Sequence, residues 1–219
     1  MWATITGSAR GLGRGLALGF AERGYSLVLH ARNNALLEET AQLAQKFKVQ
    51  TKLIVGDLTD SKVLQNITDT SSAVGSSILL NNAAIPCPGK PFTELSSKEI
   101  ADLLKVNLEI PISLTHSFWP RLKGTMSPAI IFLNSMVGIE PKLHRTIYTA
   151  VRFGLRGFTE SLALEAKDSG IRVFGVYPTR IRSRPEYEYG FEVDEVVQMI
   201  LEFYDHGTGT ELILDGRPK

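Results

Sequence analysis

The chain has 219 residues, 43% of them hydrophobic and 21% charged, which suits one globular domain covering residues 1–219. Its 24 basic and 23 acidic residues leave a formal charge of +1, so no broad positive field attracts nucleic acid or an anionic membrane. The single cysteine excludes an intramolecular disulfide and is typical of a reducing compartment. No signal-peptide pattern or membrane-length apolar run is present. We therefore expect a cytoplasmic protein that acts on a small molecule.

Short apolar runs alternate along the chain with longer segments of helical periodicity, a pattern typical of β-α-β units. The predicted strands are Trp2–Thr6, Ser26–His30, Thr51–Val55, Ile78–Asn81, Ala129–Asn134, Arg172–Tyr177 and Glu211–Leu214. The predicted helices are Gly13–Glu22, Asn34–Phe47, Ser61–Ser71, Lys98–Arg121, Tyr148–Lys167 and Asp194–Tyr204. Strands rich in Val, Ile and Leu indicate a sheet covered on both faces, so we expect a three-layer α/β fold with a doubly wound parallel sheet. Its ligands should bind at the carboxyl ends of the strands.

A glycine-rich loop, Thr-Gly-Ser-Ala-Arg-Gly-Leu-Gly at residues 6–13, follows the first predicted strand. Glycines permit a tight turn, and the helix that follows offers free N–H groups and a positive dipole end to a pyrophosphate. Alone, the pattern fits an ordinary strand-to-helix turn equally well, but its place in a β-α-β chain favours dinucleotide binding. The expected contacts are Gly7, Ser8, Arg10, Gly11, Leu12 and Gly13.

Arg32 follows the second predicted strand, where an acidic residue would bind the adenosine ribose 2′-hydroxyl of NAD. A guanidinium in this place can form bidentate bonds to a 2′-phosphate, and Arg10 lies on the same side of the expected site. The sequence therefore favours NADP(H) over NAD(H). The alternative interpretation is that Arg32 is a solvated surface residue.

Four positions in the second half of the chain form an ordered pattern. Asn107 stands in Lys-Val-Asn-Leu, Ser135 stands in Asn-Ser-Met-Val-Gly, and Tyr148 is followed one helical turn later by Arg152. With the Thr-Gly-x-x-x-Gly-x-Gly loop and Asn-Asn-Ala-Ala at residues 81–84, this pattern resembles the short-chain dehydrogenase/reductase family over essentially the whole chain. The resemblance implies a Rossmann-fold, NAD(P)-dependent oxidoreductase acting on CH–OH groups.

The resemblance also implies roles for the four residues. Carbonyl reduction needs a hydride, a proton and hydrogen bonds to the oxygen that gains charge. Tyr148 would supply the proton and Ser135 would hold the oxygen, with Asn107 completing the set. The family has lysine where this chain has Arg152. Positions 148 and 152 share a helix face, so the guanidinium can reach the tyrosine and the nicotinamide ribose, but it is bulkier and stays protonated. Retained, slowed and lost turnover all remain open.

Further cofactor contacts follow from the resemblance after the later strands. The adenine edge would meet the third strand's end, and the nicotinamide carboxamide would meet the sixth. The residues concerned are Asp57, Leu58, Asn82, Ala83, Ala84, Pro178, Ile181 and Ser183, together with Tyr148 and Arg152. Ala84 and Thr179 stand where the family has glycine, and the segment before the last helix is shorter than the family's usual lid.

These features leave two functional hypotheses. The first is an NADP(H)-dependent reductase that interconverts a ketone or aldehyde and an alcohol. The second is a catalytically impaired relative that binds dinucleotide as a sensor or scaffold. His144 borders the expected pocket but is interpreted as a solvated loop residue, and no metal site is expected. Helix residues suited to close packing predict a homodimer or homotetramer: Leu114, Phe118, Trp119, Gly154 and Gly157.

Overall fold

The computed structural model describes residues 1–182 and 190–217. The strands are β1 (Trp2–Thr6), β2 (Ser26–Ala31), β3 (Thr51–Val55), β4 (Ser76–Asn81), β5 (Ala129–Leu133), β6 (Arg172–Pro178) and β7 (Glu211–Leu214). The helices are α1 (Gly11–Glu22), α2 (Asn34–Gln45), α3 (Ser61–Ala73), α4 (Ser97–Leu104), α5 (Ile110–Leu122), α6 (Thr146–Ala166) and α7 (Val193–His206). In this part of the chain no helix is both long and apolar enough to cross a membrane.

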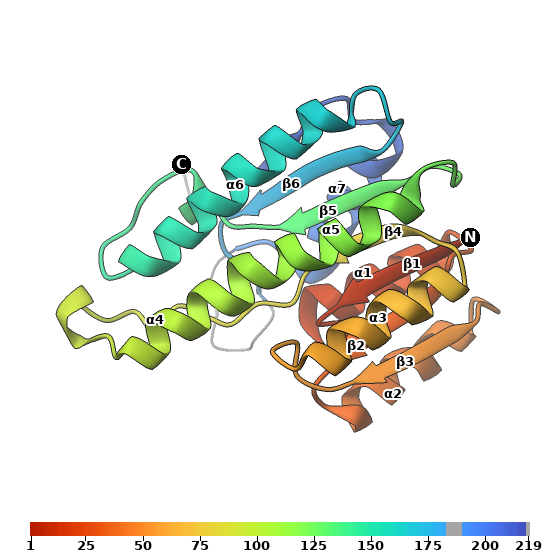
Figure 1. Ribbon diagram of the computed structural model, residues 1–219, viewed down its shortest axis with the longest axis horizontal. Helices are drawn as coiled ribbons and strands as arrows, with labels where there is room; N and C mark the ends of the chain where they lie inside the picture. Colours follow the sequence, from red (N-terminus) through yellow and green to blue (C-terminus); the bar gives the residue numbers. More distant parts are fainter. Residues whose placement is uncertain (183–189, 218–219) are drawn as a thin grey trace.

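All described strands run parallel in one sheet with the order β3-β2-β1-β4-β5-β6-β7 (Figure 1). The central strand β1 places Thr4 opposite Val28 of β2 and Leu79 of β4. The chain reverses its direction of travel across the sheet between β1 and β4, which opens a crevice at their carboxyl ends. The doubly wound α/β fold expected from the sequence is confirmed, as a single domain.

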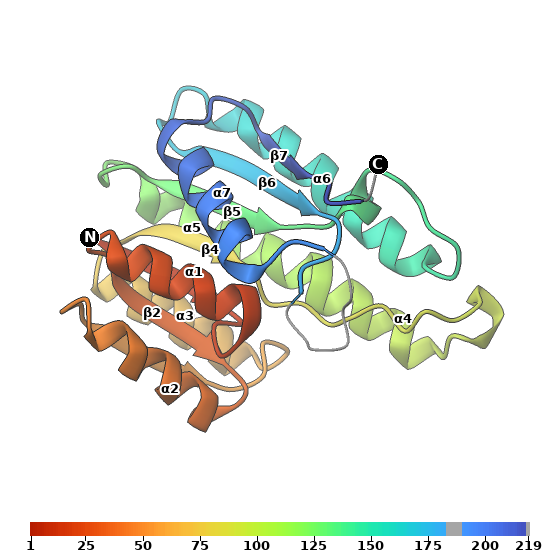
Figure 2. The same cartoon turned by 180° about the vertical axis from the view of Figure 1, so that it is seen from behind.

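The helices cover both faces of the sheet, because each strand sends alternate side chains to opposite sides. Helices α1, α2 and α7 pack with Ile5, Leu29 and Leu80 on one face (Figure 2). Helices α3, α5 and α6 pack with Leu79 and Ile130 on the other (Figure 1). These two apolar layers fix the ends of β1, β2 and β4, and therefore the crevice.

The region predicted as one helix, Lys98–Arg121, is helical from Ser97 to Leu122, with one wider turn at Lys105–Glu109 where α4 passes into α5. Such a turn closes i to i+5 hydrogen bonds and often occurs at functional sites. Here it contains the buried Asn107. Pro111 lies just after this turn, and neither Pro111 nor Pro120 ends the helix.

The residues expected at a subunit interface prove to be largely internal. Leu114 and Phe118 are buried against the protein's own sheet, and Trp119 packs on the same layer. Gly154 faces a leucine side chain of the same chain, whereas the surface beside Gly157 is open. The apolar character of α5 is thus explained by its own core, which the sequence pattern could not distinguish from an interface.

Candidate active site

The loop between β1 and α1 turns tightly around its glycines. Gly7 and Gly11 have φ angles of 70° and 53°, in the left-handed region that favours glycine. A Cβ on Gly13 would lie 2.1 Å from the Gly7 carbonyl oxygen, so a side chain there forces the loop apart. The Asn82 side chain donates to the carbonyl oxygens of Thr6 and Gly7 at 2.9 and 3.0 Å. No side chain caps the start of α1, which leaves its first N–H groups available to an anion.

A cavity of about 830 Å³ extends from this loop along the ends of β2, β3 and β4, which is a volume typical of ligand sites. Most of the predicted cofactor residues line it: Gly7, Arg10, Gly11, Leu12, Gly13, Arg32, Asp57, Leu58, Asn82, Ala83, Ala84 and Ile181. The narrow glycine cradle and the uncapped helix start make the cavity a fit for the pyrophosphate of a dinucleotide.

Four predicted contacts lie elsewhere. Ser8 is fully buried, and both its N–H and its hydroxyl donate to the carbonyl oxygen of His30, so it shapes the loop from behind. Tyr148, Arg152 and Pro178 do not line the cavity. Its lining also includes Ile85 and Val106, and Asn107, next to Val106, hydrogen-bonds the Ile85 backbone. Ser183 lies outside the described residues.

Arg32 and Asp57 face each other at the open rim of the cavity. The Arg32 side chain is 72% exposed, and its Nη1 lies 3.7 Å from a carboxylate oxygen of Asp57. Hydrogen bonds from the N–H and hydroxyl of Thr59 lower the pKa of Asp57, with a smaller contribution from Arg32. An exposed ion pair at this distance contributes little, so Arg32 remains available to a phosphate.

His30 also lines the cavity, although it belongs to none of the sequence motifs. It is buried at the end of β2, with Nε2 3.0 Å from the Gly56 carbonyl oxygen. Burial lowers the pKa of His30, so the ring is neutral near pH 7, with the proton on Nε2. Its Nδ1 has no partner within the described chain. The sequence signal for this residue was a histidine near the end of an otherwise apolar strand, Ser-Leu-Val-Leu-His-Ala at residues 26–31.

The end of β5 is tied to α6 through Asn134. Its side chain donates to the Arg152 carbonyl oxygen at 3.0 Å and accepts from the Ser135 N–H at 2.9 Å. The Ser135 oxygen accepts from the Val137 N–H at 3.2 Å, and its proton has no acceptor in the described residues. The serine hydroxyl is therefore able to donate to a ligand oxygen, and its position is fixed relative to α6.

Arg152 packs against the ring of Tyr148, one turn away on α6. The guanidinium carbon lies 4.8 Å from the ring centre, and the residue is only 4% exposed. Nη1 donates to the Leu133 carbonyl oxygen at 2.9 Å, whereas Nε finds no acceptor in the described chain. A buried N–H without a partner is costly, and a ligand hydroxyl would satisfy it. The arginine side chain therefore lies between the Tyr148 ring and the end of β5.

Asn107 is buried and its side chain pairs with the backbone of Ile85. Its Oδ1 accepts from the Ile85 N–H at 2.8 Å, and its Nδ2 donates to the Ile85 carbonyl oxygen at 3.0 Å. Both ends of the amide are therefore occupied by the segment that follows β4. In this geometry Asn107 holds the cavity wall and makes no hydrogen bond to Tyr148 or Arg152.

The loop before α6 is held at two points. The Cys87 Sγ lies 3.8 Å from the His144 carbonyl oxygen, and the Glu140 carboxylate accepts from Arg217 at 2.6 and 3.2 Å. The His144 side chain is exposed. The short lid segment, residues 184–191, falls almost wholly outside the described residues. Within the described chain no three His, Cys, Asp or Glu side chains gather into a metal site.

Residues 1–188 match the family model for short chain dehydrogenases. A very-long-chain 3-oxoacyl-CoA reductase of Scheffersomyces stipitis is 29% identical over 78% of this chain, which spans 53% of that relative. Sulfoacetaldehyde reductase 2 of Chromohalobacter salexigens is 30% identical over 80% of this chain and 70% of its own length. An inactive hydroxysteroid dehydrogenase-like protein 1 of Pongo abelii is 28% identical over 81% of this chain and 54% of its own.

Solved structures show the same architecture. The bulky-bulky ketone specific alcohol dehydrogenase of Comamonas testosteroni is 29% identical, with a TM-score of 0.88 over 96% of this chain and 84% of its own. A metagenomic short-chain oxidoreductase in complex with NADP is 26% identical, with a TM-score of 0.86 over 98% of this chain and 96% of its own. A short-chain dehydrogenase from Sphingobium yanoikuyae in complex with NADPH is 28% identical, with a TM-score of 0.87 over 97% of this chain and 86% of its own.

The fold, the glycine cradle and the family match lead to one conclusion. This chain belongs to the short-chain dehydrogenase family of NAD(P)-dependent oxidoreductases.

Proposed function

We propose that the chain is an NADP(H)-dependent oxidoreductase that interconverts a ketone or aldehyde and an alcohol, with Tyr148 as general acid and base. The observation that carries this proposal is the buried Arg152 guanidinium, 4.8 Å from the Tyr148 ring centre. A fixed cation beside the tyrosine favours the tyrosinate that forms when the proton leaves. Bound NADPH would supply the hydride at the nicotinamide end of the cavity.

The neighbouring residues support this assignment. Ser135 would donate its free hydroxyl proton to the carbonyl oxygen as charge develops there. Arg152 takes the place of the family's lysine, and its guanidinium would bind a ribose hydroxyl. Asn107 would act by holding Ile85, which lines the cofactor cavity. Tyr148, Ser135 and Arg152 form the catalytic set of the proposal, and Asn107 is its positioning residue.

Cofactor selectivity is proposed to lie with Arg32 and Arg10 at the rim of the cavity. Both are exposed, and a 2′-phosphate between them would gain charge-assisted bonds that a 2′-hydroxyl cannot form. Titration of NADPH and NADH by nicotinamide fluorescence should give tighter binding of NADPH. Arg32→Ala should lose that preference while retaining NADH binding. Equal affinities in the parent protein, or an unchanged preference in the variant, would contradict the proposal.

A dinucleotide-binding protein with impaired catalysis is the alternative. It is favoured by the arginine at position 152 and by the existence of a relative named inactive. The deciding experiment measures NADPH oxidation against a panel of carbonyl compounds and measures NADPH binding separately. Turnover that depends on Tyr148 supports the oxidoreductase. Tight NADPH binding without turnover of any carbonyl supports the binding protein.

An assembly of two or four copies is also proposed, on a surface different from the buried residues of α5. On α6, Phe153 is 41% exposed and Leu164 is 64% exposed, with the open surface of Gly157 between them. A second copy of the same helix could cover this apolar strip, since the glycine permits close approach.

A further inference from the structure

Arg14 is an unexpected residue for its position. It stands directly after the last glycine of the loop, in the first turn of α1, where the positive end of the helix dipole disfavours a cation. Its side chain is nevertheless only 25% exposed. A partly buried charge in an unfavourable field needs compensating contacts, and these contacts point behind the loop.

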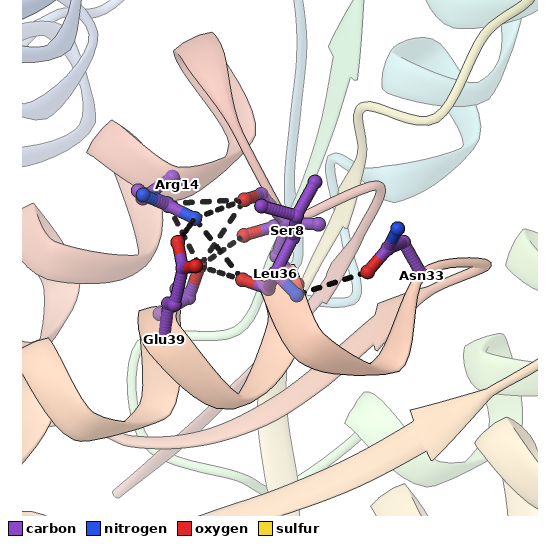
Figure 3. Close-up of polar contacts among 7 residues, drawn as sticks. Ser8, Arg14, Asn33, Leu36 and Glu39 are labelled. Atoms are coloured by element: carbon purple, nitrogen blue, oxygen red, sulfur yellow. Dashed lines mark hydrogen bonds and ion pairs between the residues drawn. The ribbon is translucent and has the colours of Figure 1, made fainter.

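The Arg14 guanidinium joins the glycine-rich loop to α2 (Figure 3). Nε donates to the Ala9 carbonyl oxygen and to the Thr40 hydroxyl oxygen, both at 3.0 Å. Nη2 donates to the carbonyl oxygens of Ala9 at 2.7 Å and Leu36 at 3.1 Å, and to the Glu39 carboxylate at 2.9 Å. One side chain therefore binds backbone on both sides of the junction.

Thr40 completes the connection from the α2 side. It is fully buried, and its hydroxyl oxygen lies 3.0 Å from the Ser8 carbonyl oxygen and 3.1 Å from that of Leu36. Because it also accepts from Arg14, this hydroxyl uses both its donor and its acceptor capacity. We call Arg14 and Thr40 together the loop clamp.

The loop clamp controls which way the loop's peptide groups face. In a planar trans peptide, the carbonyl of one residue and the N–H of the next point in opposite directions. Holding the Ser8 and Ala9 carbonyls toward α2 therefore turns the N–H groups of Ala9 and Arg10 away from it. Neither N–H has a hydrogen-bond partner in the described residues. Without the loop clamp, these peptides could rotate and present carbonyl oxygens, which repel phosphate.

The same contacts reach the residues beside Arg32. Leu36 accepts from Arg14 through its carbonyl oxygen, and its N–H donates to the Asn33 side chain at 3.0 Å (Figure 3). Asn33 caps the start of α2 and directly follows Arg32. The loop clamp thus links the pyrophosphate end of the cavity to its 2′-phosphate rim.

We propose that Arg14 and Thr40 are positioning residues that set both the affinity for the dinucleotide and its preference for a 2′-phosphate. They act through the peptide groups and through α2, without touching the ligand. This inference rests on the proposed NADP(H) binding.

The test compares Thr40→Val, Thr40→Ser, Arg14→Lys and Arg14→Gln with the parent protein. The valine variant keeps the shape and loses the hydroxyl, whereas serine keeps the hydroxyl. Arg14→Lys keeps the charge but cannot bridge both elements. The matched control is Arg23→Gln, because Arg23 follows the other end of α1 and pairs with Asp205. Dissociation constants for NADPH and NADH are measured by nicotinamide fluorescence, with the melting temperature of each variant.

Thr40→Val and both Arg14 variants should weaken NADPH binding roughly tenfold, equivalent to about 1.4 kcal/mol. NADH binding should weaken less, so the preference for NADPH falls. Thr40→Ser should stay near the parent, and Arg23→Gln should change the melting temperature without changing either constant.

Parent-like NADPH binding in Thr40→Val or Arg14→Lys overturns the loop clamp. If the affinities for NADPH and NADH fall equally, the loop clamp has no role in selectivity and acts on pyrophosphate binding alone. A parent protein that binds neither cofactor refutes the proposed function instead. If Arg14→Gln does not fold, the Thr40→Val and Thr40→Ser pair still decides the question.

Discussion

Replacing Arg152 tests whether its charge acts on Tyr148 in the proposed mechanism. Transfer of the Tyr148 proton to a carbonyl oxygen leaves a tyrosinate beside the guanidinium, 4.8 Å from the ring centre. At an effective dielectric near 20, a unit charge at that distance stabilises the tyrosinate by about 3.5 kcal/mol. Arg152→Ala should therefore slow turnover by roughly two to three orders of magnitude, since each 1.36 kcal/mol is about tenfold in rate.

Arg152→Lys retains the charge and should retain turnover. It should exceed the parent rate if the site still fits lysine, because an ammonium can pass protons that a guanidinium holds. Tyr148→Phe removes the proton donor and should nearly abolish turnover. All three variants should bind NADPH, because the glycine-rich loop is unchanged.

The assay follows NADPH oxidation with a carbonyl compound that the parent reduces, and NADPH binding is measured on the same preparations. Unfolding curves identify variants that fail for structural reasons, since the buried guanidinium also bonds the Leu133 carbonyl. Parent-like turnover in Tyr148→Phe would refute the mechanism. Parent-like turnover in Arg152→Ala would show that its charge does not act on the tyrosine.

Three further predictions follow from the packing. Gly13→Ala should abolish binding of both cofactors in fluorescence titration, because its Cβ would meet the Gly7 carbonyl oxygen at 2.1 Å. Asn107→Ala should lower the free energy of unfolding in urea by about 1–3 kcal/mol, because both polar groups of Ile85 lose their partner. Leu164→Glu should convert the proposed oligomer to a monomer by light scattering, and a parent protein that is already monomeric would contradict the interface.

Much of the fold could be predicted because its signals are local. The strands β1, β3 and β7 begin and end at the predicted residues, since each is a short run rich in β-branched or apolar residues that is followed by a glycine or an aspartate. The helix predicted over Lys98–Arg121 is also present, but its wide turn around Asn107 was not predicted. A wide turn between two helices keeps the helical periodicity on both sides, so nothing in the spacing reveals it. The Asn107 side chain in that turn bonds the backbone of Ile85, 22 residues away.

The residues of the candidate site also fall into two groups, those with a local sequence signal and those that meet only through tertiary packing. The glycine cradle follows from backbone geometry, which the glycines themselves dictate. By contrast, Arg14 and Thr40 meet only after α1 and α2 pack side by side, and neither belongs to a recognisable motif. The sequence signal was indirect and concerned Arg14 alone. It is a basic residue in the first turn of a helix, where the helix dipole disfavours a positive charge. A local conflict of this kind is a reason to look for a tertiary partner.

His30 allows a test of pH dependence that is independent of catalysis. Burial lowers its pKa below 6.5, so the unfolded chain binds the proton more readily than the folded protein does. The free energy of unfolding should therefore fall as the pH drops below 6.5, by up to about 1.4 kcal/mol per unit. Carboxylates with lowered pKa, such as Glu99 at about 2, lose their contribution only below about pH 4.5. Urea unfolding between about pH 7 and 5 should show this loss in the parent and not in His30→Gln, which keeps a donor for Gly56. If the free energy of unfolding falls equally with pH in the two proteins, protonation of His30 is not linked to folding.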